Sequence, residues 1–126
     1  MMEVKMVSIP VKDPVAAFKH YTTVLGFEQV MFDKEAQLAI IIGENKSNTS
    51  ILLEPIEGSD ITKNYQKALR EANIPVMTFS TDNLKEEYIR LVNLNVHFSK
   101  APTATDWGAE AIFDDNCGNL IQLIQD

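Results

Sequence analysis

Apolar and polar residues alternate along residues 4–11, and this period of two predicts a β-strand. At Asp13 the period lengthens to that of a helix, with Pro14 in the first turn and Gly26 after the last turn. Three runs rich in strand-forming residues follow, at 27–32, 37–42 and 50–54. The first part of the chain is therefore predicted to have the order β-α-β-β-β.

The same succession of patterns recurs about seventy residues later. It predicts a strand at 76–81, a helix from 83 to about 94, and strands at 96–99, 109–113 and 120–124. Asp13 precedes Gly26 by thirteen residues, and Asp82 precedes Asn95 by thirteen residues. We therefore expect an Asp N-cap, and a residue tolerant of positive φ just after the helix, in both copies. A repeat of this kind buries its apolar faces by pairing its copies.

A connector at 57–73 joins the two copies, and the pattern at 65–72 predicts two helical turns within it. We expect one domain over residues 1–126. Module one occupies about 1–56, and module two occupies about 74–126.

Several short motifs occur in a characteristic order: Val11-x-Asp13-Pro14, Tyr21, Leu25-Gly26-Phe27 and a closing Asp115-Asn-Cys-Gly118-Asn119. In this order they resemble the vicinal oxygen chelate superfamily, which comprises glyoxalases, bleomycin-resistance proteins and extradiol dioxygenases. The resemblance covers nearly the whole chain. It implies an α+β fold of two βαβββ modules that form a paired, curved mixed sheet around a cleft, often within a homodimer.

The resemblance also implies metal ligands on the first and fourth strands of each module, usually His, Gln or Glu. These positions align with Met6, Leu52, Val76 and Gln122, with Ile51 as the alternative to Leu52. A divalent cation needs several oxygen, nitrogen or thiolate donors, and one thioether, one amide and two hydrocarbon side chains do not supply them. We therefore predict no metal and no cofactor.

Strand parity assigns a mostly apolar set of side chains to the cleft: Met6, Ser8, Leu52, Val76, Thr78 and Gln122. Trp107 lies in a polar loop predicted at 103–108, and we interpret it as either a lid over a ligand or a packing or dimer contact. Apolar lining with a few polar groups is typical of small-molecule pockets. A filled core between the two copies is the other interpretation.

The remaining candidates for chemistry are His20, His97, Cys117 and Glu54, none of which has a partner at catalytic or metal-ligand spacing. We interpret the histidines as surface or structural residues, Cys117 as part of a turn and Glu54 as a residue of the cleft rim. No catalytic residue is assigned.

Charge and composition exclude some classes of binding partner. The 126 residues carry a formal net charge of -7 and form no basic stripe, which argues against nucleic acid. A single cysteine is compatible with a reducing compartment, and no apolar run approaches the roughly 20 residues of a membrane span. We expect a cytoplasmic protein with no membrane partner.

These observations favour a metal-independent binding protein of the glyoxalase and bleomycin-resistance type, which sequesters a hydrophobic or cationic compound in the cleft of a homodimer. The alternative is a glyoxalase-type lyase or isomerase, or a related metalloenzyme, acting on a small oxygenated substrate. A third interpretation is a domain that mainly dimerises and serves as a partner or regulator of another protein.

Overall fold

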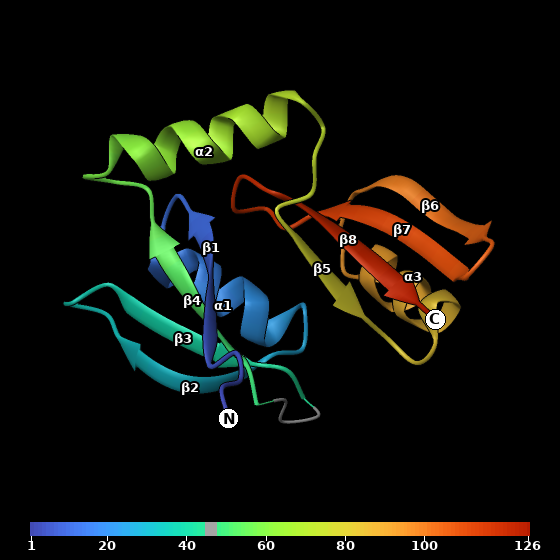
Figure 1. Cartoon of the computed structure of the whole chain (residues 1–126), viewed down its shortest axis with the longest axis horizontal. Helices are drawn as coiled ribbons and strands as arrows, with labels where there is room; N and C mark the ends of the chain where they lie inside the picture. The colour runs from blue at the N-terminus through green and yellow to red at the C-terminus, as the bar shows by residue number, and fades with distance from the viewer. Residues whose placement is uncertain (45–47) are drawn as a thin grey trace. The chain divides into compact units, whose positions relative to one another are not determined.

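The computed structural model describes residues 1–44 and 48–126, and the chain divides into two compact units, Met1–Asn64 and Tyr65–Asp126. The first unit contains, in order, β1 (Met6–Val11), α1 (Pro14–Thr23), β2 (Glu28–Asp33), β3 (Leu38–Ile42) and β4 (Ser50–Pro55) (Figure 1). Helix α2 (Asp60–Glu71) runs across the division between the units. The second unit continues with β5 (Met77–Ser80), α3 (Leu84–Asn93), β6 (Phe98–Thr105), β7 (Gly108–Asp114) and β8 (Leu120–Gln125).

The two units repeat one sheet topology, which confirms the predicted α+β fold of two βαβββ modules. The strand order is β1-β4-β3-β2 in the first sheet and β5-β8-β7-β6 in the second. In each sheet the first and fourth strands are parallel, and the other pairs are antiparallel. Ser8 pairs with Leu52 in the first sheet, and Thr78 pairs with Gln122 in the second, so these two pairs are equivalent.

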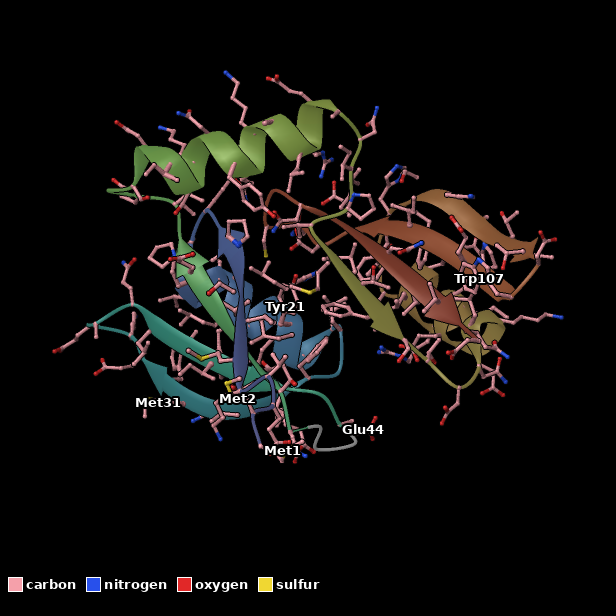
Figure 2. The ribbon with its side chains drawn as sticks, viewed as in Figure 1. Met1, Met2, Tyr21, Met31, Glu44 and Trp107 are labelled. Carbon is pink, nitrogen blue, oxygen red and sulfur yellow. The ribbon has the colours of Figure 1, made fainter. Side chains whose placement is uncertain are left out.

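One helix covers one face of each sheet. In the first unit Ile9, Val11 and Leu53 are fully buried, together with Tyr21 of α1 (labelled in Figure 2). The ring of Phe18 stacks on Phe32 with centroids 4.2 Å apart. In the second unit Leu84, Leu91, Phe113 and Ile121 are buried, and Tyr88 of α3 meets Phe98 edge to face at 4.7 Å. Alternation along the strands leaves the opposite face of each sheet for other contacts.

The helix ends confirm one predicted cap and correct the other. Asp13 caps α1, where its Oδ1 accepts hydrogen bonds from the backbone N–H groups of Val15 and Ala16 at 3.0 and 3.3 Å. The predicted Asp82 cap is wrong, because Asn83 occupies the N-cap of α3 and its Oδ1 accepts from Glu86 N at 3.1 Å. An N-cap must directly precede the first helical residue, and Asp82 lies one position too early.

The residues after the two helices behave as predicted. Gly26 has φ 89° and Asn95 has φ 66°, so both are left-handed. Glycine takes this conformation without steric cost, and asparagine is among the few other residues that adopt it readily.

Replacing Asn83 by alanine is expected to lower the free energy of unfolding by about 1 kcal/mol, because the N–H of Glu86 loses its acceptor. Urea unfolding measures the change. Asp82→Ala is the matched control and should change stability by less than about 0.5 kcal/mol. An equal loss in the two variants would contradict the assignment of Asn83 as the cap.

Helix α2 and strand β6 extend well beyond their predicted bounds. Helix α2 begins at Asp60, five residues before the predicted start, because Ser59 Oγ accepts from Thr62 N at 3.2 Å and so satisfies a free donor of the first turn. Strand β6 extends to Thr105, so the predicted loop at 103–108 is only a short turn at Asp106 and Trp107. Pro102 is tolerated within β6 because β6 is an edge strand.

Candidate functional site

The face of the first sheet that points away from α1 carries a row of mostly apolar side chains. The pairing register aligns Ser8, Leu52, Ile40 and Met31 across the four strands. Met31 remains 49% exposed, and Met6, two residues before Ser8 on the same face, remains 45% exposed (Figure 2 labels Met31). Large apolar side chains are therefore accessible on a sheet face whose other side is a closed core.

This face is hollowed at one end by a pocket of about 500 Å³. Its apolar lining consists of Val4, Met6, Val30, Ile40 and Ile42, and its polar lining consists of Glu3, Lys5, Asn48 and Ser50. A volume of this size falls in the range of small-molecule sites, which spans roughly 300 to 1,000 Å³. The carboxylate of Glu3 and the ammonium of Lys5 offset each other, so the lining favours a neutral apolar occupant.

A β-bulge contributes one wall of the pocket. The register between β2 and β3 shifts between Gln29 and Met31, so Val30 is an extra residue of β2. Bulges redirect side chains, and here Val30 lines the pocket. The sequence pattern did not indicate Val30, Ile40 and Ile42 as site residues, because alternation carries no signal for the bulge in β2 or for the pairing of β2 with β3.

The equivalent face of the second sheet is more polar. Its register aligns Thr78, Gln122, Ile112 and Lys100 across the strands. Thr78 Oγ1 donates a hydrogen bond of 2.8 Å to Gln122 Oε1, and Lys100 Nζ lies 2.9 Å from Glu110 Oε1. Two polar pairs therefore lie on either side of Ile112.

The predicted cleft residues fall into two groups, one on each sheet. Met6, Ser8 and Leu52 share the face away from α1, and Thr78 and Gln122 share the face away from α3. Val76 directly precedes β5, and its N–H donates to Leu120 O at 2.9 Å. Trp107 lies in the turn between β6 and β7 and is 49% exposed (Figure 2). Its proposed role as a lid stays a prediction.

The turn between β7 and β8 contains a buried polar network that sequence analysis did not find. Asp115 is fully buried, and its Oδ1 accepts from the N–H groups of Cys117 and Asn119 at 2.8 and 3.0 Å. Gln66 of α2 donates from Nε2 to Cys117 O at 3.1 Å. A Cβ on Gly118 would lie 2.7 Å from Gln66 Nε2, so the glycine allows this close approach. The network joins α2 to the turn and supports a structural role for Cys117.

An ion pair reinforces the same connection. Arg70 Nη2 of α2 lies 2.6 Å from Asp114 Oδ2 at the end of β7. Partial burial acts to raise the pKa of Asp114, but the hydrogen bonds from Arg70 and from the N–H of Asn116 outweigh it, so the pKa lies below its usual value.

The other candidates from the sequence lie on separate elements. His97 is exposed, and its carbonyl accepts a hydrogen bond from Asp114 N. His20 lies within α1. Glu54 pairs with Pro10 near the edge of the first sheet.

Comparison with known proteins places this geometry in a family. The model of the Glyoxalase/Bleomycin resistance protein/Dioxygenase superfamily matches residues 3–123. The chain belongs to this superfamily. It is 35% identical to the protein YurT of Bacillus subtilis strain 168 over 127 residues, which cover 98% of this chain and 99% of that protein.

Two solved structures share the fold of this chain. UcmS2 has a TM-score of 0.83 at 23% identity, with coverage of 100% of this chain and 99% of that chain. TnmS3 from Streptomyces sp. CB03234, described as an antibiotic binding protein, has a TM-score of 0.75 at 23% identity, with coverage of 99% and 96%. These likenesses confirm the fold of this chain.

The positions that hold the superfamily's metal do not fit a metal ion here. The register makes Leu52 the equivalent of Gln122, and it places Ile51 on the buried side toward α1. Met6 offers a thioether, Leu52 and Val76 offer no donor, and Gln122 Oε1 already accepts from Thr78. Within residues 1–44 and 48–126, no group of three or more His, Cys, Asp or Glu residues is placed to hold a metal ion.

The described helices also bear on membrane association. None of those within residues 1–44 and 48–126 is both long and apolar enough to cross a bilayer.

Proposed function

We propose that this superfamily member is a metal-independent small-molecule binding protein that sequesters an apolar compound on its first sheet. The observation that carries the proposal is the pocket of about 500 Å³, whose walls are Val4, Met6, Val30, Ile40 and Ile42. The antibiotic binding protein TnmS3 has the same fold, so the fold is compatible with this role.

The hydrophobic effect supplies the driving force for binding. Each 100 Å² of apolar surface that a ligand covers on Met6, Val30 or Met31 stabilises the complex by roughly 2.5 kcal/mol before the costs of association. Met6 lines the pocket, and Met31 pairs with the pocket residue Ile40 on the neighbouring strand. Methionine side chains are flexible and polarizable, so they adapt to ligands of different shape and favour aromatic rings. The pocket is therefore suited to a range of apolar aromatic compounds.

Sequestration needs no chemical step, and the polar groups of the pocket fit a supporting role. Ser50 Oγ donates to the carbonyl of Lys5, the residue before β1, at 3.4 Å. This hydroxyl therefore already has a backbone acceptor. Ser8 and Leu52 extend the same sheet face beyond the pocket. The homodimer, the cytoplasmic location and the affinity for cationic compounds stay predictions from the sequence.

The proposal is tested with N-phenyl-1-naphthylamine, a neutral dye that fluoresces in apolar sites. Titration of the purified protein is expected to give saturable fluorescence enhancement at one dye per chain. The dissociation constant is expected to be the same before and after dialysis against EDTA, because the pocket is built from hydrocarbon and thioether groups. Absence of saturation, or binding that requires added zinc or nickel, would contradict the proposal.

A further inference from the structure

Ser50 brings a hydroxyl into the apolar part of the pocket on the first sheet. It pairs with Met6 on β1 and with Ile42 on β3, and both of these neighbours line the pocket. Ile51, the next residue of β4, is buried in the core, so alternation turns Ser50 to the opposite face. Among the described residues of the pocket lining, Ser50 alone carries a hydroxyl.

The proton of this hydroxyl is already used by the backbone. Ser50 Oγ donates to Lys5 O at 3.4 Å, and Ser50 N donates to the same oxygen at 3.0 Å. A hydroxyl has one proton and two lone pairs, so a serine whose proton is used still accepts a hydrogen bond. Ser50 therefore adds an acceptor, and not a donor, to the pocket.

The surroundings of Ser50 increase the effect of this acceptor on binding. Ser50 is half-buried, and its neighbours across the strands carry a thioether and a hydrocarbon side chain. An apolar ligand in the pocket displaces water from Oγ, and a polar atom that loses water without a new partner costs free energy. A ligand with an O–H or N–H group within reach of Oγ avoids this cost, whereas a hydrocarbon or an ether does not.

The other polar residues of the pocket are less suited to this selection. Glu3, Lys5 and Asn48 are all exposed, so water satisfies their side chains with or without a ligand. A hydrogen bond that only replaces one to water contributes little to affinity. The charges of Glu3 and Lys5 are opposite, and an ionised ligand loses hydration against the apolar lining. A neutral donor is therefore favoured over an ammonium or a carboxylate.

We propose that Ser50 selects neutral aromatic compounds that carry an O–H or N–H donor, by accepting a hydrogen bond at Oγ. This inference rests on the proposed binding function and names the ligand class of the same pocket. Ser50 acts as a specificity-determining residue, and the carbonyl of Lys5 positions its hydroxyl.

The test compares 2-naphthol with 2-methoxynaphthalene, in which a methyl group caps the hydroxyl. Isothermal titration calorimetry measures the ratio of the dissociation constant of the ether to that of the naphthol. Ser50→Ala is expected to lower this ratio about fivefold, because only the naphthol loses a hydrogen bond, while the ether binds within twofold of the wild type. Ser50→Thr keeps the hydroxyl and is expected to keep the ratio.

Ser50→Cys is a second variant of nearly the same shape. Its thiol is a weak acceptor, so most of the same loss is expected. Ser8→Ala is the matched control, because Ser8 lies on the same sheet face but does not line the pocket. Glu3→Gln tests the carboxylate as an alternative acceptor, and both controls are expected to leave the ratio unchanged. Circular dichroism checks that each variant is folded.

The outcomes separate this inference from the proposed function. A ratio that Ser50→Ala and Ser50→Cys leave unchanged, or that falls equally in Ser8→Ala, would overturn the inference and leave the proposed function intact. A ratio that falls only in Glu3→Gln would assign the selection to the carboxylate and would also overturn it. Failure of the wild type to bind the two naphthalenes and N-phenyl-1-naphthylamine would overturn both.

Discussion

Replacing Asp115 by alanine is expected to lower the free energy of unfolding by about 3 kcal/mol. The carboxylate is fully buried, and it accepts the N–H groups of Cys117 and Asn119 and the side-chain amide of Asn119. Alanine leaves these donors buried without an acceptor, and the turn that receives Gln66 of α2 loses its shape. Urea unfolding followed by circular dichroism measures the loss.

Two controls separate the network from a general effect of charge. Asp106→Ala removes an exposed carboxylate from another turn and should change stability by less than about 0.5 kcal/mol. Asp115→Asn keeps one acceptor oxygen and should fall between alanine and the wild type. A loss of under about 1 kcal/mol for Asp115→Ala would show that the network is not needed.

Replacing Met6 by lysine is expected to weaken the binding of N-phenyl-1-naphthylamine about 30-fold, or ~2 kcal/mol. Met6 lines the pocket and is 45% exposed, so the lysine fits without disturbing the core but places an ammonium against an apolar ligand. The fluorescence titration of the dye measures the change.

Ile89→Lys is the matched control for this charge insertion. Ile89 is 50% exposed on α3, on the second unit, and does not line the pocket. Its replacement is expected to leave the dissociation constant within twofold of the wild type. Equal weakening by the two lysines would argue against the pocket as the binding site.

The repeat made most of the fold predictable. Helix starts and stops are local signals, and Asp13, Gly26 and Asn95 occupy the predicted positions. Local signals also misled, since Asp82 and Asn83 are both good caps and only the exact start of α3 decides between them. The start of α2 was missed because its Ser59 cap stands in a run of polar residues.

The candidate site was predictable in part. Met6, Ser8 and Leu52 share one sheet face, as strand parity predicts, because alternation is a local property of strands. Their role in binding a ligand stays a prediction. The pocket depends on the bulge at Val30 and on pairing between strands, which a sequence pattern does not contain. The polar network joins Gln66 to Cys117, 51 residues apart in the chain, and no local signal connects them.

The scaffold of the superfamily is retained while its metal positions are not. Met6, Leu52 and Val76 supply no set of ligands, and the face that carries Met6 and Leu52 has an apolar pocket. We therefore propose binding, rather than metal chemistry, as the role of this face.

Amide chemical-shift mapping of the metal-free protein with N-phenyl-1-naphthylamine tests this claim most directly. The largest shift changes are expected at Met6, Ile40, Ile42 and Ser50, which line the pocket. Shift changes centred on α2 or α3, or changes that develop only after zinc or nickel is added, would contradict the account.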